Sequence, residues 1–295
     1  MTWTETKLHP LFGAEITGLD PRDPFDDRAR DALEAAFIRN AVTVIRNAVP
    51  LGDEEQIAFT GRFGPLQQMK MLNMLGRADT GKATIRMRYP ELVDVGNLDE
   101  EGRILAAGDR RRAFNKGNEL WHTDVSFDDN RATFSFLNAH VVPPSGADTE
   151  FADMRAAHDT LPAATKARIT DLVAEHSIWY SRALGGLSEV SEAEKMTRPP
   201  AHHRLVHMRR GATRNSLYLA SHASHILGMP IAEGRALLRA LTEHATRPEL
   251  VYRHRWRAGD LVIWDNLATM HRGTLFDDTV HRRDMRRTTV LERAA

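Results

Sequence analysis

Two side chains in the segment 120–127 (LWHTDVSF) could bind a metal ion together. His122 and Asp124 lie two residues apart, and residues i and i+2 of an extended strand project from the same face. Two protein ligands hold a divalent ion weakly, so a third should come from elsewhere, and His271 in the segment MHRG is the best candidate. Two histidines and one carboxylate leave three adjacent positions open on the ion, which is typical of non-haem Fe(II) oxygenases.

The same residues allow other interpretations. The chain has 14 histidines, and a His-x-Asp tripeptide also arises by chance. A His-Asp-His site could hold Zn(II) for hydrolysis if a general base lay nearby, or the protein could be a non-catalytic binding module. His222 and His225 in SHASH also resemble a metal pair, but no carboxylate stands beside them, so we expect them to be structural.

The composition limits the possible partners of such a site. The 295 residues carry 40 basic and 40 acidic side chains, so the formal net charge is zero, without the basic surplus usual in nucleic-acid binders. No stretch reaches the roughly 18 apolar residues needed to span a bilayer, and the first residues do not resemble a signal peptide. Cysteine is absent, which excludes disulfides and thiolate ligands. We therefore expect a cytoplasmic protein with no nucleic-acid or membrane partner.

Strands distributed along the chain, with helices between them, must position these residues. Helical spacing predicts helices over 26–40, from Asp53 (whose side chain could cap it) to about 63, over 153–161 and 163–175, and over 230–246. Apolar and β-branched runs predict strands over 41–47, 132–142, 250–256, 261–266 and 287–291, and the stretch 185–215 is loop-like. This order favours a single domain over 1–295, mainly β with helical additions, of the double-sheet jelly-roll type.

The stretch from 66 to 118 differs from the rest because it shows little sustained periodicity and is rich in glycine, methionine and charge. A loop of that length inside a compact domain is often a lid or disordered. We predict a lid within 66–118.

Longer motifs resemble the taurine/2,4-dichlorophenoxyacetate dioxygenase (TauD/TfdA) family over nearly the whole chain. In order, the matching segments are LHPLFGAEITGLD, QIAFTGRFGPL, LWHTDVSF, VVPPSGADTEFADMRAAHDTLP, SHASHILGMPIAEGRALL, EHATRPELVYRHRWRAGDLVIWDN and MHRG with an Arg-rich tail. Several of them are closest to the aryloxyacetate branch. The resemblance implies a double-stranded β-helix barrel, a jelly-roll variant. It also implies that His122, Asp124 and His271 hold Fe(II), which acts with the cosubstrate 2-oxoglutarate and with O2.

The family spacing implies roles for three further residues. The family places an arginine for the distal carboxylate of 2-oxoglutarate eleven residues after the second histidine, here Arg282, with the hydroxyl of Thr149 beside it. A second arginine, fifteen residues after that histidine, faces the substrate anion and falls on Arg286. Both arginines can share one face of a strand, because their numbers differ by four. The alternative is a solvated basic face.

The implied reaction is oxidation of a small organic anion. The leading substrate class is an aryloxyalkanoate of the 2,4-dichlorophenoxyacetate type, giving a phenol, an oxoacid, succinate and CO2. A sulfonate such as taurine, an alkyl sulfate or another small carboxylate is the alternative. The chain departs from the family at Met208-Arg209, where close relatives have a Thr-His pair, so its substrate could differ from theirs. We also expect a homo-oligomer.

Overall fold

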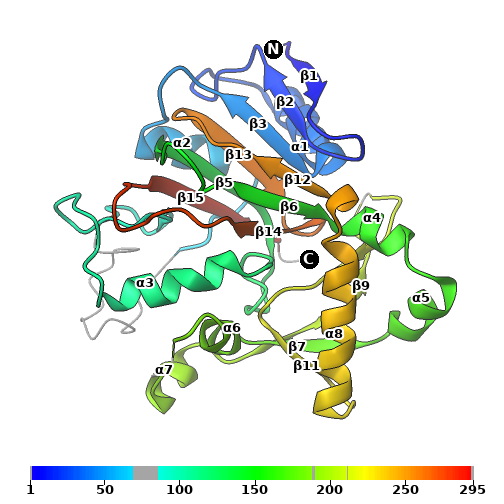
Figure 1. Ribbon diagram of the computed structural model, residues 1–295. Coiled ribbons are helices and arrows are strands. Elements are labelled where there is room, and N and C mark those ends of the chain that lie inside the picture. Colours follow the sequence, from blue (N-terminus) through cyan, green and yellow to red (C-terminus); the bar gives the residue numbers. More distant parts are fainter. Residues whose placement is uncertain (1, 69–85, 188–189, 211, 294–295) are drawn as a thin grey trace.

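The structure is a computed structural model that describes residues 2–68, 86–187, 190–210 and 212–293 (Figure 1). Its strands are β1 (Thr4–Lys7), β2 (Ala14–Thr17), β3 (Val42–Arg46), β4 (Val93–Asp94), β5 (Ala132–Val141), β6 (Thr149–Asp153), β7 (Val173–His176), β8 (Ala201–Arg204), β9 (Val206–His207), β10 (Ser216–Leu217), β11 (Ala223–Ile226), β12 (Val251–His254), β13 (Asp260–Asp265), β14 (Thr269–Gly273) and β15 (Asp284–Leu291). Its helices are α1 (Asp27–Asn40), α2 (Asp53–Gly61), α3 (Arg110–Asn115), η2 (Lys116–Glu119), α4 (Met154–Asp159), α5 (Ala163–Ile169), α6 (Ile178–Leu184), α7 (Glu192–Thr197), α8 (Ile231–Ala245) and η3 (Pro248–Leu250).

A large sheet with the strand order β1-β2-β3-β13-β5-β15-β4 forms the main layer. β13 lies between β3 and β5 and pairs antiparallel with both, with Ile263 opposite Thr43 and Phe136. Alternation along β13 sends Leu261 and Ile263 to one face and Val262 and Trp264 to the other. Because both faces are buried, the strand is apolar from Leu261 to Trp264, between the terminal residues Asp260 and Asp265.

Helices α1 and α2 cover the outer face of this sheet, in the upper part of Figure 1. The phenylalanines Phe37 and Phe59 pack edge-on against Phe136 of β5, with ring centroids 5.9 and 6.0 Å apart. Asp26 caps α1 by accepting from the backbone N–H of Ala29. The prediction that Asp53 caps α2 is wrong. The N-cap residue is Gly52, whose backbone N–H donates to the Glu55 side chain.

The inner face of the large sheet packs against a smaller antiparallel sheet, β12-β6-β14. The buried core between them includes Val262 and Trp264 of β13, Leu137 of β5 and Phe151 of β6. Sequence analysis did not predict β6 or β14, although β14 carries His271. Each of these strands is only five residues long, and both include polar side chains. The alternation of apolar and polar residues that would predict a strand is therefore too short to recognise.

A third layer extends the fold beyond the smaller sheet. Helix α8 packs on the sheet β11-β7-β8 through Leu238 and Leu241, beside Ile226 of β11. The region 185–215, expected to be loop-like, contains α7, β8 and β9 within its described residues. The predicted helix over 163–175 is shorter than expected, because α5 ends at Ile169 and the chain continues as β7.

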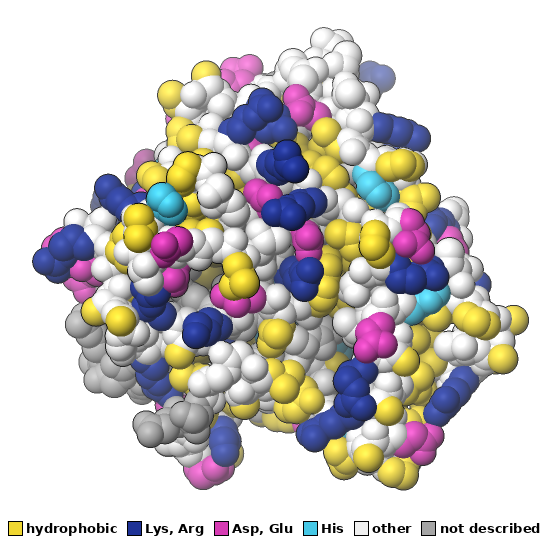
Figure 2. Space-filling model, viewed as in Figure 1, with side chains coloured by type: hydrophobic (Ala, Val, Ile, Leu, Met, Phe, Trp, Pro, Cys, Tyr) yellow, Lys and Arg dark blue, Asp and Glu magenta, His cyan; other side chains and the backbone are white. Residues whose placement is uncertain are grey.

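The architecture is a mixed, sheet-rich fold with helices. None of the sheets formed by the described residues closes into a barrel. Residues 69–85 of the expected lid lie outside the described residues, and the part from 86 to 118 contains β4, α3 and most of η2, with irregular chain over 86–92 and 95–109. No helix in the described ranges is both long and apolar enough to cross a membrane. Acidic and basic side chains are interspersed over the face shown in Figure 2.

Candidate metal centre and cavity

The structure brings His122, Asp124 and His271 together, as the sequence predicts. One possible ligand atom from each lies within 4.8 Å of the others, and all three residues are buried. The Nε2 atoms of His122 and His271 lie 3.9 and 3.8 Å from the two carboxylate oxygens of Asp124. This is the set of three donors expected of a 2-His-1-carboxylate site.

The local backbone achieves this convergence by a different route from the expected strand. His122 and His271 form an isolated antiparallel bridge with two hydrogen bonds, N–H to O, of 2.9 and 2.8 Å. After His122 the chain enters a turn rather than a strand. Val125 in that turn has φ +58°, a left-handed conformation that a β-branched residue rarely adopts. The turn therefore directs the Asp124 carboxylate back to the bridged histidines at a cost in backbone strain.

A chain of buried hydrogen bonds fixes Asp124. The hydroxyl of Ser135 on β5 donates to the carboxylate at 2.7 Å and accepts from the Asn266 side-chain amide at 2.9 Å. The amide oxygen of Asn266 accepts from the backbone N–H of Asp124 at 3.2 Å and from the Trp264 indole at 3.1 Å. In the sequence Asn266 is only the last residue of the predicted strand 261–266, and no signal marks Ser135. The strand β13 thus positions the metal centre through Asn266, directly after its last residue.

The charges at the centre suit a divalent cation. Burial alone would raise the pKa of Asp124, but Arg287, the two histidines and the Ser135 hydroxyl together lower it to about 2. Burial lowers the pKa of His122 and that of His271, so both imidazoles are neutral ligands at pH 7. The His122 Nδ1 lies 2.7 Å from the carbonyl oxygen of Leu120. That carbonyl can only accept, so Nδ1 carries the proton and Nε2 keeps its lone pair for a metal.

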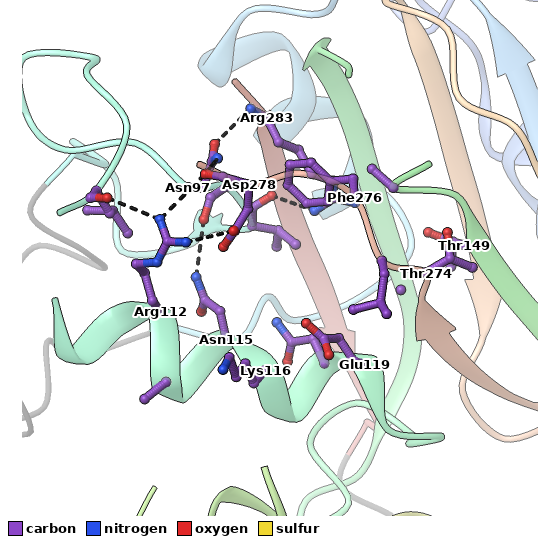
Figure 3. A pocket seen from close by; sticks show the side chains of 18 of the residues that line it. Asn97, Arg112, Asn115, Lys116, Glu119, Thr149, Thr274, Phe276, Asp278 and Arg283 are labelled. Atoms are coloured by element: carbon purple, nitrogen blue, oxygen red, sulfur yellow. Dashed lines mark hydrogen bonds and ion pairs between the residues drawn. The ribbon is translucent and has the colours of Figure 1, made fainter. Parts of the chain in front are cut away.

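A cavity of about 630 Å³ opens beside the two histidines (Figure 3). Its walls come from η2 and α3 on one side and from β6, β14 and the chain before β15 on the other. Figure 3 shows Thr149 and Thr274 on the strand side and Lys116 and Glu119 on the helix side. This volume is within the range of small-molecule sites.

The cavity is lined by Arg283 and Arg287, not by the arginines that the family spacing selected. Arg282 is exposed, and Arg286 forms an ion pair with Asp53 of α2 on the outer face of the sheet. The two arginines that line the cavity are also four residues apart, one residue further along the chain than the pair that the family spacing selected. Met285, buried in the inner core, marks the inward face of β15, so its apolar side chain between the arginines could have given the correct phase.

Arg283 and Thr149 lie at the end of the cavity remote from η2. The backbone N–H of Arg283 donates to Asn97 at 2.8 Å and its guanidinium donates to the carbonyl of Val95 at 2.8 Å. Burial lowers the pKa of Arg283 to about 10, so the guanidinium stays charged at pH 7. The Thr149 hydroxyl accepts from the Trp256 indole at 3.0 Å, which leaves its own proton free to donate into the cavity.

The other residues singled out from sequence occupy different places. The ring of His222 lies 6.1 Å from that of His122, and its Nδ1 lies 2.7 Å from the Ser181 hydroxyl. His225 lies in the β11 sheet, 3.7 Å from Glu175. Arg209, at the departure from the family pattern, donates to buried Asp265 at 2.7 Å, so its charge is already neutralised.

Known proteins resemble this chain over its whole length. The family model "Taurine catabolism dioxygenase TauD, TfdA family" matches residues 4–289. The alpha-ketoglutarate-dependent 2,4-dichlorophenoxyacetate dioxygenase of Cupriavidus pinatubonensis is 42% identical over 294 residues, covering 100% of this chain and 99% of the relative. The (S)-phenoxypropionate/alpha-ketoglutarate-dioxygenase of Sphingobium herbicidovorans is 34% identical, covering 93% and 90%. The crystal structure of AAD-2 in complex with Mn(II) and N-oxalylglycine has a TM-score of 0.91 and 44% identity, covering 99% of both chains.

Proposed function

The chain belongs to the taurine catabolism dioxygenase TauD, TfdA family and is a 2-oxoglutarate-dependent dioxygenase, and we propose that it hydroxylates an aryloxyalkanoate of the 2,4-dichlorophenoxyacetate type. The observation that carries this proposal is the 42% identity to a 2,4-dichlorophenoxyacetate dioxygenase along the whole chain. The cavity supports it, because a metal triad and two inward arginines share one space. Hydrolysis by zinc would need neither arginine.

His122, Asp124 and His271 would hold Fe(II). The donor set fits this ion, with two neutral imidazoles and an ionised carboxylate on one side and the cavity next to both histidines. When bound, Fe(II) with 2-oxoglutarate and O2 supplies the oxidising power that places an oxygen atom on a substrate carbon and releases succinate and CO2. The protein supplies the geometry.

Arg283 and Thr149 would bind the distal carboxylate of 2-oxoglutarate. A guanidinium is always charged and can bind a carboxylate through two parallel hydrogen bonds. Trp256 fixes the Thr149 hydroxyl as an acceptor, so its proton points to the same carboxylate. Asn97 and the Val95 carbonyl hold Arg283 in place, so the cosubstrate meets an arranged site.

Arg287 would face the anion of the substrate. It lines the cavity between Arg283 and the metal centre and contacts the Asp124 carboxylate. A carboxylate held there would place the neighbouring ether carbon toward the metal. Hydroxylation of that carbon gives a hemiacetal, which collapses to a phenol and an oxoacid as the bond between that carbon and the aryloxy oxygen breaks and the hydroxyl proton passes to the leaving phenolate.

Succinate release under air tests the proposal. Protein with Fe(II) and 2-oxoglutarate should release succinate and a phenol with phenoxyacetates or with one enantiomer of 2-phenoxypropionate. Taurine and an alkyl sulfate complete the panel, since the same chemistry on these anions is the alternative. Succinate release that depends on taurine or the sulfate alone would overturn the substrate assignment, and its absence with every anion would overturn the proposed function.

Three further properties belong to the same proposal. The large sheet and β12-β6-β14 would be the two halves of the double-stranded β-helix expected for the family, since their facing sides share one core. The enzyme would act in the cytoplasm as a homo-oligomer. Light scattering of the purified protein measures the oligomeric state, and a monomer would contradict that expectation.

A further inference from the structure

Arg182 on α6 is a buried cation that forms no ion pair in the part of the chain that the structure describes. Only 7% of the residue is exposed. Its guanidinium donates to the Asn118 side-chain oxygen at a long 3.4 Å and stacks on the Phe114 ring at 4.2 Å, while Nε has no partner. Both contacts are uncharged. Buried arginines are nearly always paired with an anion, because desolvation of an unpaired charge is costly.

Three other arginines, whose side chains are only 10–13% exposed, follow that rule. Arg86 donates to Asp94 and Asp284, Arg155 to Asp153, and Arg209 to Asp265, at distances between 2.7 and 3.3 Å.. Arg182 instead resembles Arg283, which also has no ion pair among the described residues. Arg283 lines the cavity where we place the 2-oxoglutarate carboxylate. The comparison indicates that Arg182 serves a second anion.

Arg182 lies directly behind the η2 wall of the cavity, where its guanidinium contacts Gly117 and Asn118. Ser181, the neighbour of Arg182 on α6, binds His222, whose ring packs 6.1 Å from that of His122 and 5.1 Å from that of Phe127. The Asn118 side chain that Arg182 contacts belongs to a residue lining the cavity. With 2-oxoglutarate at Thr149 and Arg283, the prime substrate would take another part of the cavity, and η2, which packs on α6, forms a wall of it.

The surroundings hold the guanidinium in one orientation. A Cβ atom on Gly117 would lie 1.8 Å from Nη1 of Arg182, so only glycine lets the guanidinium lie against the η2 backbone. Phe114 covers another face. Burial, and then the charge of Arg287, lowers the pKa of Arg182 to about 10, although the more distant Asp124 carboxylate acts in the opposite direction. An anion placed between these two guanidinium groups would relieve their repulsion.

We propose that Arg182 binds the anionic group of the prime substrate from the α6 side and acts with Arg287 as a specificity-determining pair. This inference rests on the proposed function. It predicts that the enzyme discriminates for negative charge at the acid end of the substrate, and that much of this discrimination comes from a residue outside the arginine-rich tail.

Equilibrium binding tests this without turnover. Protein loaded with Mn(II) and N-oxalylglycine is titrated by calorimetry with 2,4-dichlorophenoxyacetate and with its uncharged amide. Arg182→Met should weaken binding of the acid by about tenfold or more and change binding of the amide by less than about twofold. Arg235→Met is the matched control, because Arg235 stacks 5.1 Å above Tyr180 of the same helix, and it should bind both ligands like the wild type.

The result that would overturn the proposal is equal weakening of acid and amide, or no weakening of either, because Arg182 would then only support the η2 wall. Should Arg182→Met not fold, Arg182→Lys carries the test. It should keep a preference for the acid but bind it a few-fold more weakly, since lysine cannot form the bidentate pair, and wild-type affinity for the acid would contradict the proposal.

The wild-type assay separates this inference from the proposed function. Succinate release with an alkyl sulfate but not with an aryloxyacetate would overturn the substrate assignment alone. The same titrations, run with that sulfate and with the neutral alcohol of equal chain length, then decide the role of Arg182.

Discussion

At the scale of single residues, Asp124 links the metal centre to the rest of the fold. Its carboxylate meets both histidines, Ser135 and Arg287, while its backbone is held by Asn266. These contacts keep it ionised when buried, since they outweigh the desolvation that would otherwise raise its pKa. The Asp124 carboxylate thus supplies the negative charge of a donor set whose other two members are neutral imidazoles, and this charge favours binding of Fe(II).

Removal of one ligand should therefore abolish the site. His271→Ala should lower both bound iron and substrate-dependent succinate release to below about 1% of wild type, since even outer contacts to a metal typically cost 10–100-fold. Metal analysis and the succinate assay measure this, with far-UV circular dichroism to check the fold. His225→Ala, which removes a partly exposed histidine of β11, is the control. Near wild-type iron content in His271→Ala would refute the assignment.

The arginines of the tail make a sharper test of the cosubstrate site. Arg283→Gln should raise the apparent 2-oxoglutarate requirement by about 30-fold or more, because stranding one partner of a desolvated charge pair costs about 2–5 kcal/mol. Arg282→Gln removes an exposed neighbour and should stay within about twofold. Initial rates against 2-oxoglutarate concentration decide between them. A large effect in Arg282→Gln alone would restore the original family spacing.

The arginines that line the cavity, Arg283 and Arg287 rather than Arg282 and Arg286, show which site residues could be predicted from sequence and which could not. The convergence of the candidate ligands His122, Asp124 and His271 could be predicted because their chemistry is specific and a long resemblance surrounds them. The phase of an arginine-rich strand could not be read from spacing, since one residue more between His271 and β15 exchanges the two faces of the strand. Ser135 and Arg182 were missed because their roles depend on contacts between residues far apart in the chain.

At the scale of elements, long regular segments were predictable and short ones were not. Helices α1 and α8 and strands β3, β5 and β13 follow clear periodicities, because each buries a wide apolar face. The strands β6 and β14 have five residues each and hold site residues with polar side chains. Their pairing with each other and with β12, rather than their own propensity, makes them strands.

The segment from Gly96 to Glu119 should respond to ligands as a unit. Arg112 of α3 donates to Asp278 at 2.6 Å and to the Leu105 carbonyl at 3.1 Å, which ties this segment to the chain before β15 (Figure 3). Amide hydrogen exchange there should slow when Mn(II), N-oxalylglycine and substrate are all present. Arg112→Gln should exchange about tenfold faster than wild type, as expected for loss of about 1.4 kcal/mol. Equal protection with and without ligands would argue against a lid.

At the scale of the whole molecule, buried imidazoles connect folding to pH. The third layer contains His176, which is fully buried with its ring 5.3 Å from that of His203 and 5.8 Å from that of Tyr218. Burial, and then the neighbouring His203 and His202, lowers the pKa of His176 to about 3. The cluster packs behind the metal-binding turn, since the His176 Nδ1 lies 3.1 Å from the Ser126 hydroxyl.

This burial should make the protein acid-sensitive in a specific way. Between about pH 6 and pH 4 the unfolded chain carries a proton on His176, whose ordinary pKa is near 6.5, and the folded protein does not. The unfolded state then binds more protons, so the free energy of unfolding falls as pH falls, by up to about 1.4 kcal/mol per pH unit for this residue.

His176→Phe keeps an aromatic ring and removes the titrating group. Urea unfolding at a series of pH values should show a slope reduced by up to one proton in this variant, whereas His281→Phe, at a partly exposed position before β15, should retain the wild-type slope. Identical slopes for wild type and His176→Phe would mean that His176 is protonated in the folded protein, and the acid sensitivity of the fold would then have to come from other groups.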